Sequence, residues 1–260
     1  MSSKYTARAL MLAAAAGIFC ASNARADLQV RITVFDSGGA SLGTNTGTLA
    51  GNPQGAGSIS TSLAAGGFVV VAATGLSSGS GGILQQSTTV NYNYTGPTGA
   101  TSNRLVIEFV GTNYNAPVGG VLTSSDGSLS SGTATTPANA VTMVSGISTT
   151  NQTLAVIGAT PGVPTGLAAS SVTNGSGTVT GVASLLTPNP STNGPTTTAA
   201  LYSFYQAANF ASFSGTGTGG GVFTSTLTPV PEPATIVSAL VGLGGLGLAK
   251  LRRRKTTVAA

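Results

Sequence analysis

Short runs of alternating hydrophobic and polar side chains recur between residues 27 and 228, separated by stretches rich in Gly, Ser and Thr. A period of two places alternate side chains on opposite faces of a strand, so these runs predict β-strands. The clearest example is 28–34, where every second residue from Leu28 to Val34 is apolar. The candidate strands are 28–34, 68–73, 88–94 and 105–110, with weaker ones at 141–144, 154–157, 177–185 and 222–227.

The pattern also predicts burial and loops. The unbroken apolar run 68–73 indicates a strand buried on both faces, whereas Glu108 is expected on the solvent face of strand 105–110. Asp36 is expected in a turn, because Gly38 and Gly39 follow it. The stretches 77–82 and 215–221 are expected to be loops, and 199–213 is assigned as a strand although a helical face is possible there.

No sustained helical periodicity interrupts these strands, so the chain is predicted to be all-β. About ten short strands separated by turn signals favour a single β-sandwich, of jelly-roll or immunoglobulin-like type. We assign residues 27–228 to this one domain, which is long enough to bury a core without disulfides.

The composition removes most catalytic chemistry. The chain has no histidine and one cysteine, so neither a Ser-His-Asp triad nor a histidine metal site can form. Ser77 lies in a G-x-S-x-G match, and Asp36 with Glu108 could form a glycosidase pair, but both matches carry little information. We expect no catalytic residue, cofactor or metal, and predict that the protein is not an enzyme.

The net charge of +5 comes from the two ends of the chain. Between residues 27 and 228, Arg31 and Arg104 stand against four carboxylates, Asp27, Asp36, Glu108 and Asp126. This part of the chain has no basic patch of the kind that binds nucleic acid. We therefore expect no nucleic-acid partner.

Residues 1–26 are typical of a secretory signal peptide. Lys4 and Arg8 form a positive start, and the apolar stretch 9–21 is too short to span a bilayer comfortably. Ala24-Arg25-Ala26 gives the small-x-small cleavage pattern. We place the cut between Ala26 and Asp27, with a cut after Ala24 as the alternative. Cleavage at either site removes the single cysteine.

The last 32 residues have three parts in a fixed order. A proline-rich motif covers 229–233 and includes Val230, Pro231, Glu232 and Pro233. Residues 234–251 follow as a predicted transmembrane helix, and 252–260 form a basic end that should stay cytoplasmic by the positive-inside rule. The positive charges that stop transfer are Lys250, Arg252, Arg253, Arg254 and Lys255.

This tail resembles the PEP-CTERM sorting signal of Gram-negative bacteria, through the motif at 230–235, the glycine-rich span 242–247 and the basic end 250–255. The resemblance implies recognition by an exosortase, which is a membrane cysteine protease or transpeptidase, and removal of the tail. It also implies export through an inner-membrane-anchored precursor to the cell surface or the extracellular matrix of biofilm-forming bacteria that make exopolysaccharide. The segment 103–117 resembles uncharacterised exported domains, which brings no known activity.

Two functions are compatible with these observations. The first is a non-enzymatic surface or matrix protein that an exosortase sorts through the tail. The alternative is a carbohydrate-binding module or adhesin, with an exopolysaccharide as the partner. For this alternative the expected sugar-contact residues are Tyr92, Tyr94 and Tyr114, which lie in the clusters Asn91-Tyr-Asn-Tyr94 and Asn113-Tyr-Asn115.

Overall fold

The structure is a computed structural model, which describes residues 25–230 apart from short gaps at 54–55, 79–82, 115–118, 132–138, 180–182, 186, 190–195 and 199–200. The predicted signal peptide up to Ala24, the predicted membrane helix 234–251 and the basic end lie outside the described residues. Within those residues, no helix is both long and apolar enough to cross a membrane.

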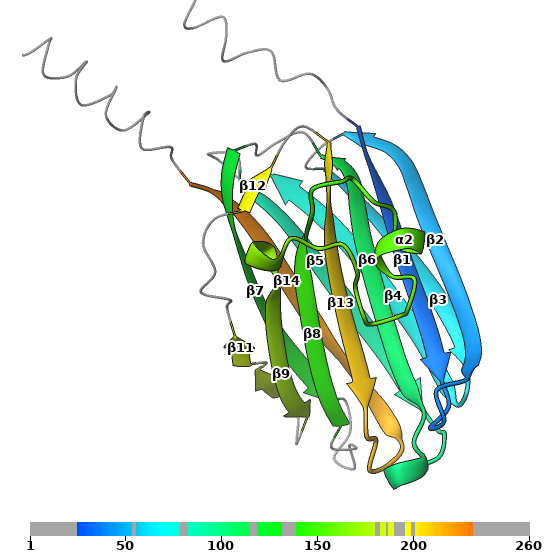
Figure 1. Cartoon of the computed structure of the whole chain (residues 1–260). Helices are drawn as coiled ribbons and strands as arrows, with labels where there is room; N and C mark the ends of the chain where they lie inside the picture. Colours follow the sequence, from blue (N-terminus) through cyan, green and yellow to red (C-terminus); the bar gives the residue numbers. More distant parts are fainter. Residues whose placement is uncertain are drawn as a thin grey trace, which may run out of the picture.

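The described part of the chain is built from antiparallel strands (Figure 1). The first seven strands are β1 (Arg25–Phe35), β2 (Ser41–Pro53), β3 (Ala56–Ala65), β4 (Phe68–Ser78), β5 (Leu84–Tyr94), β6 (Arg104–Tyr114) and β7 (Gly119–Ser131). The others are β8 (Asn139–Ser148), β9 (Thr173–Val179), β10 (Ala183–Leu185), β11 (Thr187–Asn189), β12 (Thr196–Thr198), β13 (Tyr202–Ala211) and β14 (Gly217–Pro229). The short helices are η2 (Gly99–Thr101), α2 (Leu154–Ile157) and η3 (Ala169–Ser171).

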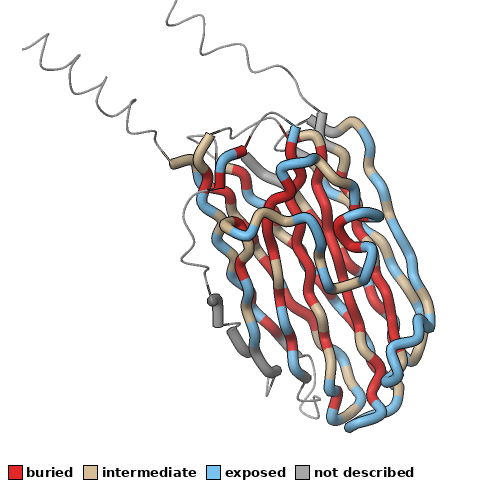
Figure 2. The backbone as a smooth tube through the Cα atoms, viewed as in Figure 1, coloured by how far each residue is buried: buried red, intermediate tan, exposed pale blue. Residues whose placement is uncertain are grey.

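These strands form two seven-stranded sheets. Sheet A has the order β11-β9-β8-β13-β6-β1-β2, and sheet B has the order β10-β7-β14-β5-β4-β3 with β12 pairing with β7. Figure 1 shows the two sheets as layers, and Figure 2 shows buried residues running along the central strands of the molecule. The predicted all-β class is therefore confirmed, and the two layers are compatible with the predicted sandwich.

The hydrophobic core lies between the sheets in two clusters. The larger cluster joins both sheets and contains seven aromatic rings, which are Phe68, Tyr92, Tyr94, Phe109, Phe210, Phe213 and Phe223. The smaller cluster includes Leu28, Leu84, Tyr114, Ile147, Tyr202, Phe204 and Leu227. Because the inward-facing positions of both sheets supply these side chains, the alternating pattern of the sequence accounts for the core.

A layer of hydrogen-bonded polar side chains separates the two clusters. On β13, Gln206 lies between Phe204 of the smaller cluster and Ala208 of the larger one. Its amide accepts a hydrogen bond from Thr88 Oγ1 (2.6 Å) and donates one to Ser225 Oγ (2.8 Å). The layer continues through the hydroxyl groups of Ser125, Ser145 and Thr173. These buried hydroxyls satisfy one another, which is what allows them to lie inside a core.

The last two strands occupy interior positions. Strand β13 lies between β6 and β8 in sheet A, and β14 lies between β5 and β7 in sheet B. Both sheets are therefore completed by residues from the C-terminal end of the domain. As a result, neither sheet can form its full ladder until residues 202–229 are available.

Most predicted strands are confirmed, and so is the assignment of 199–213, since β13 spans Tyr202–Ala211. Asp36 also lies in a turn, where its Oδ1 accepts a hydrogen bond from Ala40 N (2.8 Å). Three assignments are wrong. The single strand expected at 177–185 is instead the end of β9 in sheet A and the whole of β10 in sheet B, with 180–182 outside the described residues. Residues 154–157 form helix α2, because the segment covers a sheet face instead of joining a ladder. Most of 215–221 belongs to β14, where neighbouring strands on both sides hold its glycines in the sheet.

Strand β4 also differs from the prediction. Phe68 and Val70 are buried, but Val69 and Val71 are 59% and 48% exposed. The apolar run was expected to be buried on both faces, and this expectation is wrong. The outward face of β4 is open, because no described segment covers it.

The predicted loop at 77–82 is only partly tested. Strand β4 continues through Ser77 and Ser78, so the first two residues of the segment are strand instead of loop. Residues 79–82 lie outside the described part of the chain.

Candidate functional site

The junction between the domain and its tail is the first site of interest. Strand β14 pairs with β5 from Gly217 to Leu227 and with β7 from Gly219 to Pro229, and this last residue lies opposite Val121. One residue further on, the backbone N–H of Val230 donates a hydrogen bond to Gly120 O (2.8 Å). Val230, the first residue of the predicted sorting motif, is thus tied to β7 at the end of the β7–β14 ladder. Pro231, Glu232 and Pro233 lie outside the described residues.

A buried ion pair lies on the outer face of sheet A. Arg31 of β1 and Glu108 of β6 are direct neighbours in the ladder. Arg31 donates to Glu108 Oε2 from Nε (2.8 Å) and from Nη2 (2.5 Å), and the Glu108 side chain is fully buried. The predicted solvent position of Glu108 is therefore wrong, because the chain covers this face of β6.

Tyr205 of β13 completes the ion pair. Its hydroxyl donates to Glu108 Oε1 (2.8 Å). The pKa of Tyr205 is raised well above its usual range, mainly by burial and to a smaller extent by the nearby Glu108 carboxylate. Tyr205 therefore keeps its proton and acts as a permanent donor to Glu108.

The segment that covers this face, residues 149–172, is held by polar groups of the sheet. Gln29 Oε1 accepts from Leu154 N (2.9 Å), Arg31 Nη2 donates to Gly158 O, and Glu108 Oε1 accepts from Gly162 N (3.2 Å). Leu154 and Ile157 of α2 also pack in a cluster with Val110, Tyr205 and Ala207. The covering segment, seen in front of β1, β6 and β13 in Figure 1, is thus held by hydrogen bonds to side chains of the sheet and by apolar packing.

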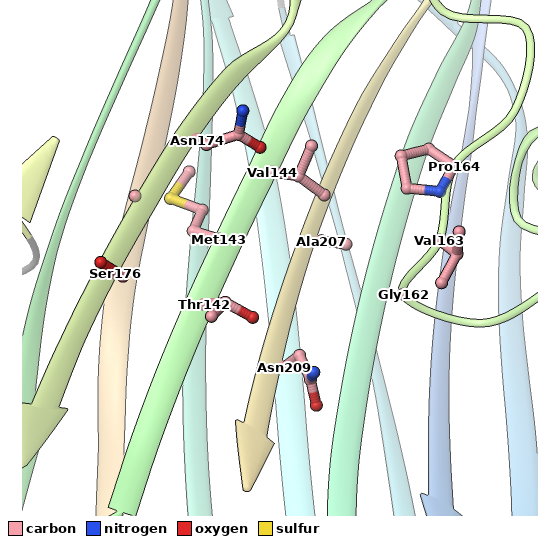
Figure 3. Close-up of a pocket in the computed structure, with 11 residues that line it drawn as sticks. Thr142, Met143, Val144, Gly162, Val163, Pro164, Asn174, Ser176, Ala207 and Asn209 are labelled. Atoms are coloured by element: carbon pink, nitrogen blue, oxygen red, sulfur yellow. The ribbon is translucent and has the colours of Figure 1, made fainter. Parts of the chain in front are cut away.

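Next to the covering segment, a groove of about 390 Å³ crosses β8, β9 and β13. Figure 3 shows the side chains of Thr142, Asn174, Ser176 and Asn209 along it, with Val163 and Pro164 on the opposite side. No charged residue lines this groove. Asn209 Oδ1 is buried and has no hydrogen-bond partner among the described residues. Because the backbone N–H of Gly162 donates a hydrogen bond to Glu108 Oε1, the ion pair also positions one wall of the groove.

The structure places the tyrosines of the predicted sugar site in the core. Tyr92, Tyr94 and Tyr114 are buried, and the first two contact Phe213. On β5 the asparagines that alternate with these rings point outward instead. A ring that stacks on a sugar must be open to solvent, so the prediction of sugar contact by these three residues is wrong.

The asparagine next to Tyr114 has a structural role. Asn113 adopts a left-handed backbone conformation, and its N–H donates to Asn151 Oδ1 (2.7 Å). Asn113 Nδ2 donates to Asp27 Oδ2 (3.1 Å), while Asp27 Oδ1 accepts from Gly51 N (2.7 Å). The residue expected to follow the signal cleavage site therefore ties β1 to β2 and β6. Ala26, the residue before it, pairs with Asn52 in the same ladder.

The geometry supports neither of the two weak catalytic matches, the Asp36 and Glu108 pair and Ser77. Glu108 lies opposite Arg31 in the ladder, and Arg31 precedes Asp36 by five residues along the chain. At 3.3 Å per residue, this places Glu108 and Asp36 roughly 16 Å apart. This is far more than the roughly 5–9.5 Å between paired glycosidase carboxylates. Ser77 lies within β4 and not at a strand-to-helix turn. No cluster of metal-ligating side chains occurs among the residues that the structure describes.

Comparison with known proteins identifies the tail. A family profile described as the PEP-CTERM protein-sorting motif matches residues 229–255. The chain carries a PEP-CTERM sorting motif. This confirms the resemblance, and the motif indicates an exported, membrane-anchored precursor that an exosortase processes and that is sorted to the cell surface. The PEP-CTERM match begins at Pro229, which is also the last residue of β14.

The other comparisons do not identify the exported domain. No curated protein matches the sequence. Among solved structures, the family 11 carbohydrate-binding module from Clostridium thermocellum is 15% identical, with 67% of this chain and 90% of that chain covered and a TM-score of 0.26. The mannan-recognising module TmCBM27 is 7% identical, with 60% and 84% covered and a TM-score of 0.26. At these TM-scores the likeness supports no statement about this domain.

Sequence reasoning missed the partnership of Arg31, Glu108 and Tyr205. The strand period did contain part of the signal, because Arg31 lies on the opposite face of β1 from the apolar residues Leu28 to Val34. Finding the pair also required knowing that β1 and β6 are neighbours and that the segment 149–172 covers them. Neither fact is local in the sequence.

Proposed function

We propose that this protein is a non-enzymatic surface protein, exported by a signal peptide over residues 1–26 and sorted by an exosortase through its tail. The observation that supports this most is the PEP-CTERM motif at 229–255, attached without a linker to an all-β domain. The final location, at the cell surface or in the matrix, belongs to the same proposal.

A structural role for the domain agrees with its chemistry. The chain has no histidine, and its buried carboxylate is engaged by Arg31, Tyr205 and Gly162 N. The buried hydroxyls of the core layer bond to one another, so none is paired with a base that could make it a nucleophile. These observations favour a stable, inert module over a catalyst.

The full chain, expressed in a host with and without an exosortase, tests the proposal. With the enzyme, we expect a smaller product outside the inner membrane; without it, the precursor should stay in the membrane. Glu232→Ala should impair processing, whereas Asp126→Ala, which removes an exposed carboxylate of β7, should not. Equal size and location of the wild type in both hosts would refute exosortase sorting.

A second candidate function is glycan binding in the groove beside the covering segment. The groove is uncharged and combines amide and hydroxyl groups with the apolar faces of Val163 and Pro164. Sugars present hydroxyl groups beside C–H faces, and sites for small molecules mix apolar surface with a few polar groups in the same way. The unpartnered Asn209 Oδ1 supports this reading, since a buried acceptor gains from a ligand donor.

A glycan array followed by titration calorimetry tests this candidate. Asn209→Ala and Asn174→Ala should weaken binding, whereas Asn93→Ala, on the outward face of β5 in the other sheet, should not. Failure of the wild type to bind any glycan, or equal effects of all three variants, would argue against the groove.

A further inference from the structure

A second recess, which we call the distal recess, lies where β1 ends and β6 begins. Its volume is about 350 Å³, and its walls come from the turn after β1, from helix η2 and Ser102, from Arg104, and from the end of β13. Recesses of about 300–1,000 Å³ are large enough for a small-molecule ligand. Unlike the groove beside Asn209, the distal recess is lined by charged side chains.

Arg104 brings an unused guanidinium group to the distal recess. Its backbone lies opposite Phe35 in the ladder of β1 and β6, and its Cζ lies 4.6 Å from the centre of the Phe35 ring. The ring thus holds one face of the guanidinium, whereas no acceptor among the described residues binds its N–H groups. In-plane N–H groups of an arginine form a fork that matches a carboxylate in a bidentate arrangement.

Asp36 adds a charge of opposite sign to the same recess. Its Oδ1 accepts the hydrogen bond from Ala40 N (2.8 Å), while Oδ2 has no partner within the part of the chain that the structure describes. Asp36 and Arg104 both line the recess, yet no ion pair joins them. A ligand can therefore meet both charges at once.

The rest of the lining is small and polar. Ser37, Ser102 and Ser212 belong to it, and a hydroxyl group can both donate and accept a hydrogen bond. A Cβ added at Gly39 or Gly99 would meet no atom within 4 Å, so the backbone borders open space at both positions. The lining thus suits a ligand with several hydroxyl groups that lies close to the main chain.

We propose that the distal recess binds a sugar that carries one carboxylate, as a uronic acid residue does. The carboxylate accepts hydrogen bonds from Arg104, and the sugar hydroxyls donate to Asp36 and exchange hydrogen bonds with the serines. The single negative charge of the ligand is balanced by Arg104. A doubly charged phosphate in the same place would be repelled more strongly by Asp36, because juxtaposed like charges weaken an interface.

The position of the distal recess leaves it accessible beside the sorting tail. In Figure 1, helix η2 lies at the bottom of the molecule, and the end of β14 lies at the top. The PEP-CTERM match begins at Pro229, the last residue of β14. The recess and the start of the sorting motif are therefore at opposite ends of the sandwich, and the inference does not depend on glycan binding in the groove.

Ligand-observed NMR titrations of the full chain in detergent test the inference with four probes. D-glucuronate carries a carboxylate and hydroxyls, D-glucose lacks the carboxylate, acetate lacks the sugar ring, and glucose 6-phosphate carries a phosphate instead. We expect glucuronate to bind about tenfold more tightly than each other probe, because it alone makes both sets of contacts. No binding of glucuronate, or a preference below about threefold over any other probe, would overturn the inference.

Substitutions of Arg104 separate the fork from its charge. Arg104→Lys keeps the positive charge but loses the bidentate arrangement, and Arg104→Gln loses both, so glucuronate affinity should fall about tenfold in the first and further in the second. Melting curves check that each variant is folded, and Arg104→Lys alone suffices where Arg104→Gln is not. Wild-type affinity in Arg104→Lys would overturn the inference.

Two further variants locate the binding. Asp36→Asn keeps an acceptor for Ala40 N but removes the negative charge, so it should raise the affinity for glucose 6-phosphate relative to glucuronate. An unchanged ratio would overturn the assignment of Asp36 to the site. Asn209→Ala, which alters the groove and not the distal recess, should leave glucuronate binding unchanged. A loss as large as that of Arg104→Gln would place the ligand in the groove and overturn the inference, while leaving the groove proposal standing.

Discussion

Strands β4 and β6 show how differently two similar apolar runs can be buried. β4 carries an unbroken apolar run, yet Val69 and Val71 on its outward face are exposed. β6 contains a carboxylate, yet it is buried on both faces, and Glu108 is fully covered. The difference comes from the covering segment 149–172, which packs on β6 and leaves β4 open. Burial of a second face is thus decided by what covers it and not by the hydrophobicity of the strand.

Alkaline pH should have the largest effect, because it acts on several tyrosines at once. Burial raises the pKa of Tyr94, Tyr114, Tyr202 and Tyr205 above the usual value near 10. Above about pH 10 the unfolded chain loses these protons while the folded chain keeps them, so the free energy of unfolding should fall as pH rises. Melting temperatures measured from about pH 8 to 12 would show this fall, and a constant value across the range would contradict it.

Loss of the ion pair should be the most damaging single substitution on the covered face. Glu108→Ala leaves Arg31, which is 15% exposed, without its partner, and removes the acceptors for Tyr205 and Gly162 N. Breaking a buried pair from one side costs about 3–5 kcal/mol. Urea unfolding measures the loss. A loss below about 1 kcal/mol, the size of a surface ion pair, would show that β6 is not effectively covered.

Two buried tyrosines allow a matched comparison of hydrogen bonding. Tyr205→Phe removes a donor to a charged group and should cost about 1.5–3 kcal/mol. In Tyr114→Phe the hydroxyl that is removed has no hydrogen-bond partner among the described residues, so stability should stay equal or rise. Chemical denaturation of both variants checks the difference, and equal losses would speak against the bond to Glu108.

Substitutions at two glycines test sterically how tightly the covering segment packs on sheet A. A Cβ added at Gly158 would lie 2.6 Å from both Arg31 Nη2 and Glu108 Oε1. Gly158→Ala should therefore cost about 1–3 kcal/mol through overpacking. Gly75→Ala in β4 is the control, because the nearest atom to its added Cβ is 3.8 Å away. Thermal unfolding should separate the two variants, and similar melting temperatures would contradict a tight fit of the covering segment.

The smallest effect is expected on the open face of β4. Val69→Thr and Val71→Thr keep a β-branched side chain in the strand and replace exposed apolar surface by a hydroxyl. Surface substitutions of this kind usually change stability by less than about 0.5 kcal/mol. Losses near 2 kcal/mol in denaturant unfolding would mean that a partner or another part of the chain covers this face.

Several features were predictable because their signals are local. Alternation in 28–34 and 88–94 correctly separates inward from outward side chains, since the strand period is set by backbone geometry. The turn at Asp36 follows from its own residues. The sorting motif is a contiguous signature, so it too could be recognised directly.

The candidate sites were less predictable, for a physical reason. Tyr92 and Tyr94 look like sugar platforms in the sequence, but the period that places their neighbours outside also places the rings inside. The groove beside Asn209 is formed by strands and a loop that are distant in the chain. Only packing brings these groups together, and no short window of sequence contains that information.

The sequence alone determined the all-β class, the lack of histidine chemistry and the identity of the sorting tail, since composition, strand period and a contiguous motif depend on nearby residues. Tertiary structure decided which strand faces are covered, because that depends on where the segment 149–172 packs. It also decided that β14 is an interior strand that ends at the sorting motif. Pairing between strands far apart in the chain is set by the competition among all possible ladders, and only the folded molecule resolves that competition.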